Sequence, residues 1–356
     1  MTTKVRGDDG PAGQPLIIPI FIPHMGCPHQ CIFCNQRSIT GKTTQTPSAN
    51  QIQQEVKCFL EYGKKRPSTT QIAFFGGNFL GLEKETIRSL LGAAMPFVRA
   101  KDVDSIRFST RPDTIGQESL SLIEQFPIST VELGVQSMND RVLTAAGRGH
   151  RASDTINASE LLKKQGYEVG LQMMVGLPGD DDAGAMQTAR RMAALKPNFV
   201  RIYPTLVLKG SPLAVQFGDG RYHPMPLAAC VTLVKRLYLF FKNHHIPVVR
   251  MGLQASDGLT RTGDLIAGPY HPAFGHLVHG EIVLDAISSA LGRMEKHPDP
   301  LTITAHPSMI SRVQGLNQQN ISRLKGTFAL KKIVLLQDAH LAKDHLMVAK
   351  QPVVLP

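Results

Sequence analysis

The sequence lacks tryptophan, is poor in other aromatic residues, and contains no long apolar run. Aromatic residues make up 6% of the 356 positions. They are not interleaved with basic residues, as they are on surfaces that bind single-stranded nucleic acids. No apolar run reaches the roughly 20 residues needed to cross a bilayer. The N-terminal segment, MTTKVRGDDGPAGQPL, has no apolar core of the signal-peptide kind. We therefore expect a cytoplasmic protein without a membrane segment.

Cysteine is also scarce, and its distribution is uneven. Three of the five cysteines, Cys27, Cys31 and Cys34, lie in the run FIPHMGCPHQCIFCNQ, whereas Cys58 and Cys230 stand alone. This pattern indicates a reducing compartment and metal binding rather than disulfide bonds. Cys58 and Cys230 are expected to be small buried apolar side chains, because free cysteines usually pack in this way.

The composition is that of a globular protein with excess positive charge. Hydrophobic residues make up 42% of the chain and charged residues 19%, and the formal net charge is +11. This charge would help to hold a polyanion such as RNA, or a phosphorylated metabolite. A solvated basic surface explains it nearly as well, because the tightest basic runs, Lys64 to Arg66 and Lys331 to Lys332, are short.

Apolar, β-rich runs alternate with helical stretches up to Tyr203, which is typical of a parallel α/β sheet. Strands are expected at Leu16–Ile22, Gln71–Phe75, Ser105–Ser109, Thr130–Gly134, Glu168–Met174 and Asn198–Tyr203. Helices are expected at Ala49–Tyr62, Glu83–Val98, Glu118–Gln125, Asp140–Ala146, Arg151–Gln165 and Ala183–Leu195. Six such units predict an open, partial (β/α)6 barrel. Pro19 removes a hydrogen-bond donor, so we expect the first strand at the sheet edge.

The pattern changes after Tyr203, and four segments are predicted. Residues 1–15 would be a flexible tail, 16–255 the partial barrel, 256–298 a segment that closes the barrel, and 299–356 a small α/β C-terminal appendage. A helix at Leu227–Lys242 and a possible seventh strand at Pro247–Met251 precede a stretch rich in Gly, Pro and His. The appendage reads as strand, helix and strand.

The three clustered cysteines predict an iron–sulfur cluster. Soft thiolates bind soft metals, and three so close together can converge on one cluster. A 4Fe-4S cluster held by three cysteines leaves one iron open to a small molecule. One alternative is a closed zinc site, which needs four ligands and would take His24 or His29 as the fourth. The other is three unrelated buried thiols.

The C-x3-C-x2-C spacing, with Phe33 before the last cysteine, resembles the radical S-adenosylmethionine (SAM) superfamily. The resemblance implies two cofactors, a 4Fe-4S cluster and SAM bound to its open iron. It further implies that one electron cleaves SAM to a 5′-deoxyadenosyl radical, which abstracts hydrogen from a substrate. An electron donor such as flavodoxin or ferredoxin would then be a partner.

Further polar motifs follow the predicted strands, where the loops of parallel α/β folds bind ligands. In GGN, from Gly76 to Asn78, the glycines let the backbone approach a ligand or turn sharply. Glu132 and Gln136 flank a strand end, and Gln136 can hydrogen-bond ribose hydroxyls. Arg148 offers a fork suited to a carboxylate. The alternatives are an ordinary turn, surface ion pairs and a helix cap.

The motifs VELGVQSMNDRVL, LQMMVGLPGD, VRIYPTLVLKGSPL and STRPD extend the resemblance from Ile17 to Leu213. Together they resemble the radical SAM domain of the Elongator catalytic subunit and, more distantly, oxygen-independent coproporphyrinogen oxidase. The resemblance implies that the three clustered cysteines hold the cluster. It places the SAM contacts at Gly76, Gly77 and Asn78 for the amine, Gln136 and Gln172 for the ribose, and Arg148 for the carboxylate. Gln172 stands where the oxidase pattern has Asp.

The sequence departs from Elongator after Tyr203. It has no Gly-rich loop of the acetyl-CoA-binding kind there, and it lacks the additional cysteines of Elongator's zinc site. We expect a shorter relative without the acetyltransferase domain, acting on RNA such as transfer RNA. One alternative is a radical SAM enzyme acting on a small anionic metabolite such as a tetrapyrrole. Another is a non-catalytic iron–sulfur protein for electron transfer or cluster handling.

The segment GPYHPAFGHLVHGE gathers His271, His276, His279 and Glu281. A second metal site is one interpretation, and ordinary polar or buried histidines are the favoured one. The segment is expected to close the open side of the barrel, and Arg250 and Gln254 can face the same cavity.

Overall fold

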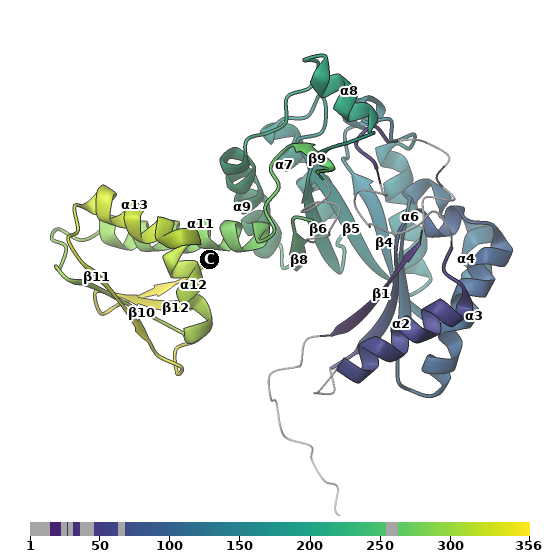
Figure 1. Cartoon of the computed structure of the whole chain (residues 1–356), viewed down its shortest axis with the longest axis horizontal. Helices are drawn as coiled ribbons and strands as arrows, with labels where there is room; N and C mark the ends of the chain where they lie inside the picture. Colours follow the sequence, from purple (N-terminus) through teal and green to yellow (C-terminus); the bar gives the residue numbers. More distant parts are fainter. Residues whose placement is uncertain (1–14, 23–26, 28–30, 36–45, 63–67, 254–262) are drawn as a thin grey trace, which may run out of the picture.

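The computed structural model describes residues 15–22, 27, 31–35, 46–62, 68–253 and 263–356. Its largest element is a curled parallel sheet of seven strands in the order β1-β2-β3-β4-β5-β6-β8 (Figure 1). The strands are β1 Leu16–Ile22, β2 Thr70–Gly76, β3 Ser105–Thr110, β4 Ile128–Gln136, β5 Glu168–Val175, β6 Phe199–Pro204 and β8 Val248–Met251. β8 is the possible seventh strand that was predicted at Pro247–Met251. All of the predicted tail except Pro15 lies outside the described residues.

The sheet has one apolar face and one polar face, because side chains alternate along each strand. Ile106 and Phe108 on β3 are buried in the apolar core beneath the helices. Arg107 lies between them in the sequence and therefore points to the opposite, concave face. Within the part of the chain that the structure describes, β1 pairs only with β2 and forms one edge of the sheet, as predicted from Pro19.

Helices follow the strands and cover the convex face of the sheet (Figure 1). They are α2 Ala49–Tyr62, α3 Lys84–Arg99, α4 Gln117–Ile123, α5 Asp140–Ala145, α6 Ala152–Lys164, α7 Asp182–Ala194 and α9 Leu227–Asn243. The predicted alternation of strand and helix is confirmed, with element ends shifted by a few residues. Short 3-10 helices follow two strands, η1 at Phe79–Gly81 and η2 at Pro112–Thr114. The side chains between helices and sheet form one continuous apolar core.

A small layer lies above the carboxyl ends of the strands (Figure 1). It consists of β7 Val207–Leu208, β9 Leu265–Ala267 and α8 Pro212–Gly218, and β7 pairs with β9 in antiparallel fashion. The helix α8 begins after Ser211, whose side chain accepts a hydrogen bond from the Ala214 amide. Tyr222, which follows α8, donates its hydroxyl to the Gly176 carbonyl at 2.7 Å and so ties this layer to the loop after β5.

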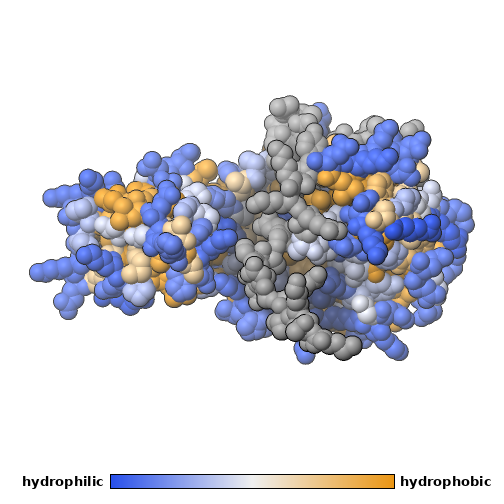
Figure 2. Space-filling model, turned by 90° about the horizontal axis from the view of Figure 1, so that it is seen from below, coloured by the Kyte–Doolittle hydropathy of each residue, from blue (hydrophilic) through white to orange (hydrophobic). Residues whose placement is uncertain are grey.

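The C-terminal residues form a separate α/β unit with its own apolar core. Its sheet has the strand order β11-β10-β12-β13, with β10 Leu301–Ala305, β11 Ile333–Gln337, β12 His345–Val348 and β13 Gln351–Val354. Its helices are α12 Ile310–Gln314 and α13 Gln319–Phe328, with 3-10 turns η3 Pro307–Met309 and η4 Leu316–Gln318. Only one face of this sheet is buried. Figure 2 shows apolar side chains grouped on the surface of this unit, and Leu336 and Val354 are exposed there.

One long helix, α11 Phe274–Gly292, belongs to both cores (Figure 1). Phe274, Val278 and Ile282 pack in the core of the barrel, whereas Val283 and Ile287 pack in the core of the C-terminal unit. The predicted barrel-closing segment thus contains a connecting helix, and the domain boundaries at 255 and 298 stay predictions. No helix among the described residues is both long enough and apolar enough to span a membrane.

Candidate cofactor site

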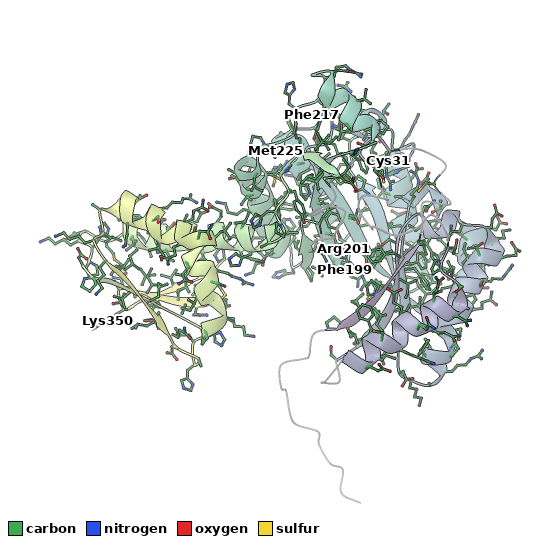
Figure 3. All side chains as sticks on the ribbon, viewed as in Figure 1. Cys31, Phe199, Arg201, Phe217, Met225 and Lys350 are labelled. Atoms are coloured by element: carbon green, nitrogen blue, oxygen red, sulfur yellow. The ribbon has the colours of Figure 1, made fainter. Side chains whose placement is uncertain are left out.

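Cys31 is buried near the carboxyl ends of the strands (Figure 3), and its neighbours in the sequence, Cys27 and Cys34, are half-buried. Burial, together with the nearby Cys31 and Cys27 thiols, raises the pKa of Cys34 to about 12. Burial also raises the pKa of Cys27, against a hydrogen bond from the Asn78 backbone that lowers it. Such thiols stay protonated until a metal displaces the protons.

The end of the cysteine loop is held from two sides. The Ile32 amide donates to the Ala146 carbonyl at 3.1 Å, and the Ile32 carbonyl accepts from the Leu213 amide at 2.8 Å. Phe33 packs against both small apolar clusters that flank the loop. Phe33 therefore anchors the segment from Cys31 to Cys34 by packing, and its predicted contact with the cofactors stays a prediction.

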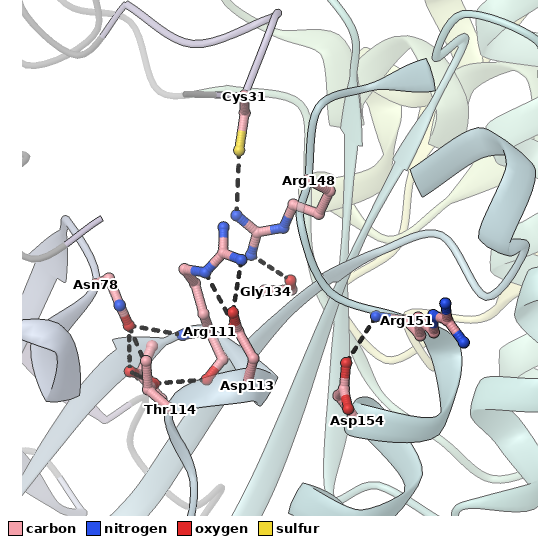
Figure 4. A network of polar contacts seen from close by, with 10 residues as sticks. Cys31, Asn78, Arg111, Asp113, Thr114, Gly134, Arg148, Arg151 and Asp154 are labelled. Carbon is pink, nitrogen blue, oxygen red and sulfur yellow. Dashed lines mark hydrogen bonds and ion pairs between the residues drawn. The ribbon is translucent and has the colours of Figure 1, made fainter. Parts of the chain in front are cut away.

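Arg148 reaches the cysteines directly (Figure 4). Its Nη1 lies 3.4 Å from Cys31 Sγ, and its Nη2 donates to the Gly134 carbonyl at 2.5 Å. The guanidinium fits only because Gly134 has no side chain, since a Cβ there would lie 2.8 Å from Arg148 Nη2. Arg148 is 7% exposed, so this cation is placed inside the protein, beside a thiol.

A second charged group lies beneath Arg148, in the loop after β3 (Figure 4). Arg111 forms a bidentate ion pair with Asp113, at 2.9 Å from Nε and 2.7 Å from Nη2. Burial and the nearby Arg148 lower the pKa of His150 to about 3, so this imidazole is neutral at neutral pH. These residues were not assigned roles from the sequence, although STRPD and GRGHR contain them. A charged pair directly after a buried strand was the available signal.

Asn78, the last residue of GGN, is 2% exposed and organises the loop after β3. Its side-chain oxygen accepts from Thr110 Oγ1 at 2.7 Å and from the Arg111 amide at 3.0 Å. Gly76 has a φ of 110°, a conformation that favours glycine, and Gly77 is half-buried beside it. The Asn78 side chain is thus committed to the protein, while its backbone contacts Cys27.

Gln136 ends β4 with a φ of 66°, which is unusual for a residue with a side chain. Its Oε1 is buried and has no hydrogen-bond partner among the described residues. Strained backbone and unpaired buried polar atoms are both costly, and they concentrate at functional sites. Gln172 on β5 lies opposite Gly134 in the sheet register and is half-buried on the same concave face.

Glu132 lies deeper in the concave face and is engaged by two arginines. Arg107 Nη2 lies 2.5 Å from Glu132 Oε1, and Arg201 Nε lies 2.5 Å from Glu132 Oε2. The Arg107 guanidinium stacks 5.0 Å above the centre of the Phe199 ring, and Gly170 leaves room for that ring. The geometry favours Glu132 as the centre of a structural ion network rather than a direct cofactor contact. Arg107 and Arg201 were not identified from the sequence.

The histidine-rich segment does not form a metal site. No three His, Cys, Asp or Glu residues among those described converge on a single ion, and this includes His271, His276 and His279. His279 instead packs edge-on against Tyr238, and burial lowers its pKa to about 4.

The three clustered cysteines also do not converge on a single ion among the described residues. In a 4Fe-4S cluster the cysteines bind different irons, so the thiols need not converge on one point.

The remaining predicted residues are the two isolated cysteines, the alternative zinc ligands, Gln254 and Arg250. Cys230 is buried as predicted, but Cys58 is exposed because it lies on the outer side of α2, so that prediction was wrong. The alternative zinc ligands His24 and His29, and also Gln254, lie outside the described residues. Arg250 is paired in register with Arg201 and thus lies on the concave face.

The residues at this site fit a cluster and SAM. Three thiols, a cation beside one of them, and the gap at Gly134 that a Cβ would fill are grouped toward the carboxyl ends of the strands. Gln136 Oε1, Arg148 Nε and Arg111 Nη1 are buried there without hydrogen-bond partners among the described residues. An incoming polar ligand would supply such partners.

Comparison with known proteins gives the class of protein. Residues 21–192 match the model of the radical SAM superfamily, and residues 197–283 match that of the radical SAM C-terminal domain. A Methanocaldococcus jannaschii protein, described as uncharacterized, is 30% identical over 229 residues, which are 61% of this chain and 69% of that protein. The chain therefore belongs to the radical SAM superfamily. It is a radical SAM enzyme, and its cofactors are a 4Fe-4S cluster and SAM.

Within this superfamily the chain is similar to Elongator-type proteins. It is 26% identical to the tRNA uridine(34) acetyltransferase of Dehalococcoides mccartyi over 250 residues, or 61% of this chain and 54% of that enzyme. It is 29% identical to Elongator complex protein 3 of Drosophila melanogaster over 224 residues, or 53% and 41%. The chain thus spans about half the length of these relatives.

A solved structure confirms the fold. The archaeal Elp3 of Methanocaldococcus infernus superposes with a TM-score of 0.59 at 20% identity, covering 76% of this chain and 63% of the other. The predicted partial barrel of the radical SAM type is therefore confirmed.

Proposed function

We propose that this enzyme modifies RNA, with transfer RNA as the first candidate, by abstracting hydrogen at the carboxyl ends of the barrel strands. When bound, the cluster and SAM supply a one-electron cleavage that yields a radical able to abstract hydrogen. One observation carries the radical part of the proposal. Cys31, the cation of Arg148 and the amide oxygen of Gln136, which has no partner among the described residues, are buried together at the carboxyl end of β4.

The chain's residues would divide the work as follows. Cys27, Cys31 and Cys34 would hold the cluster, and Phe33 would fix the loop by packing. Arg148 would pair with the SAM carboxylate, since its buried Nε has no partner among the described residues. The amine would meet backbone of the GGN turn, and the ribose would meet the two glutamines, Gln136 and Gln172.

The deeper part of the concave face would shape the substrate pocket. The network of Glu132 with Arg107 and Arg201 fixes two guanidinium groups in place. Phe199 covers Arg107 from one side. Such a rigid wall excludes water and stray hydrogen donors from the reacting atoms, which protects a reactive intermediate.

Two observations support RNA as the substrate class. Similar proteins of Dehalococcoides mccartyi and Methanocaldococcus jannaschii are named as acetyltransferases of uridine 34 in transfer RNA. The chain carries a formal net charge of +11, which favours association with a polyanion. A small anionic metabolite is the competing substrate. Its binding should depend on salt much less steeply than that of RNA, because it carries few charges.

The first experiment tests the radical chemistry. The protein is reconstituted anaerobically with iron and sulfide, reduced with dithionite and mixed with SAM, and 5′-deoxyadenosine is measured. We expect product from the wild type and from Cys58→Ala, which removes an exposed cysteine, but none from Cys31→Ala. Equal product from Cys31→Ala, or cluster-loaded wild type that neither binds nor cleaves SAM, would refute the proposal.

The second experiment tests the substrate. Binding of bulk transfer RNA is measured from low to high salt, and the RNA is then digested and its nucleosides analysed by mass after incubation with SAM and reductant. Contacts with several phosphates predict an affinity that falls steeply as salt rises. Absence of salt-dependent binding and of any new nucleoside would contradict RNA and leave the metabolite.

A further inference from the structure

We propose that Arg148 sets the reduction potential of the cluster by donating a hydrogen bond to the sulfur of Cys31. This inference rests on the proposed assignment of Cys31 as a cluster ligand. It gives Arg148 a positioning and tuning role in addition to any contact with SAM.

The geometry that carries the inference is the path of the Arg148 side chain. Its Nη1 lies 3.4 Å from Cys31 Sγ, a distance suited to an N–H donor and a sulfur acceptor. The neighbouring Nη2 is held by the Gly134 carbonyl at 2.5 Å, which fixes the orientation of the guanidinium plane. Figure 4 shows the guanidinium between these two partners. Arg148 therefore points one donor at the sulfur before any ligand arrives.

The surroundings keep this cation in place. Gly134 leaves a gap that a methyl group would fill, so the approach is built into the strand. The neighbouring arginine, Arg111, is neutralised by its bidentate pair with Asp113. His150 packs nearby and is uncharged at neutral pH. One unshared positive charge thus faces the sulfur, in surroundings that water does not screen.

Charge and hydrogen bonding to cluster sulfurs are two of the means by which proteins set cluster potentials. Reduction adds one electron and makes the cluster more negative, so a cationic donor at a ligand sulfur stabilises the reduced form. Arg148 should therefore raise the potential and make the cluster easier to reduce. Removing the donor should lower the potential.

The test is a redox titration of the reconstituted cluster in the absence of SAM, followed by absorbance and by the electron paramagnetic resonance signal of the reduced form. Without SAM, a lost carboxylate contact cannot move the potential. The variants are Arg148→Gln, Arg148→Lys and Arg151→Gln. Arg151 is an exposed arginine three residues away, and its loss changes the net charge equally.

We expect Arg148→Gln to lower the equilibrium constant for reduction at least tenfold, which is about 59 mV for one electron. Arg148→Lys keeps the charge and should recover part of the shift, and Arg151→Gln should match the wild type. Should Arg148→Gln fail to hold a cluster, Arg148→Lys with its smaller shift carries the test.

Two results would overturn the inference while leaving the proposed function intact. One is an unchanged potential in cluster-loaded Arg148→Gln, or in Arg148→Lys if that is the variant that loads. The other is an equal fall in Arg148→Gln and Arg151→Gln, which would make the effect one of net charge. A wild type that assembles no cluster would refute the proposed function itself.

Discussion

Replacing Gly134 by alanine should disturb the site more than the added methyl group suggests. The new Cβ would lie 2.8 Å from Arg148 Nη2, 3.0 Å from Gln136 Nε2 and 3.7 Å from the Thr110 carbonyl. The backbone at Gly134 has no positive φ, so alanine is permitted there and the space is the only obstacle. Arg148 would have to leave the Gly134 carbonyl, the sulfur, or both.

The magnitude follows from these contacts. Extra volume in a packed region typically costs about 1–3 kcal/mol, and a lost hydrogen bond to a charged group about 1.5–3 kcal/mol. Both clashing atoms are the ends of flexible side chains that can move, so we expect Gly134→Ala to lower the free energy of unfolding by about 1.5–3 kcal/mol, mainly through the lost hydrogen bond of Arg148. SAM affinity should fall as well. Urea denaturation and a binding titration measure the two effects.

Two controls separate the clash from a general effect of alanine. Gly92→Ala lies in α3 with no atom within 4 Å of the new Cβ, and it should be neutral or stabilise by about 0.5–1 kcal/mol. Combining Gly134→Ala with Arg148→Gln should cost less than the sum of the single changes, because the clashing group is then smaller. Wild-type stability and SAM binding in Gly134→Ala would refute the reasoning.

Three further predictions test other parts of the site. Glu132→Ala leaves the buried Arg107 and Arg201 charges facing each other, so it should lower the free energy of unfolding by about 3–5 kcal/mol in chemical denaturation. Glu132→Gln should cost less, and wild-type stability of both variants would contradict the network. Gly170→Ala puts a Cβ 2.3 Å from the Phe199 ring and should destabilise comparably to Gly134→Ala, whereas a silent change would mean that the ring can move. Because the folded pKa of His150 is lowered from 6.5 to about 3, the unfolded chain binds the extra proton between these values. Stability should therefore fall as pH falls through that window, by up to about 1.4 kcal/mol per unit, and the fall should be shallower in His150→Asn.

The sequence was sufficient to predict the repeating units and the cluster motif. The alternation of apolar, β-rich runs with stretches of helical periodicity can be recognised within short segments of the sequence. Three cysteines in one short run can also be recognised without knowing the tertiary structure. The edge position of β1 also followed from a single residue, Pro19, because the missing donor acts locally.

Contacts between distant strands could not be predicted in this way. Arg107, Glu132 and Arg201 meet because β3, β4 and β6 lie in particular registers of the curled sheet, and no spacing in the sequence encodes that pairing. The gap at Gly134 is likewise a contact between distant residues, because Arg148, which follows α5, reaches back to Gly134 on β4. The exposure of Cys58 could not be predicted either, because it depends on which side of α2 packs against the core.

The hold on Ile32 has a consequence for how the enzyme is made. The cysteine loop leaves the ribosome early, but its two anchors, Ala146 and Leu213, are synthesised much later. At typical translation rates the second anchor follows on the order of ten seconds behind the first cysteine. During that interval the Ile32 carbonyl has no Leu213 amide to accept from. Both backbone anchors of Ile32 therefore exist together only after the start of α8 has been synthesised, late in the production of the barrel.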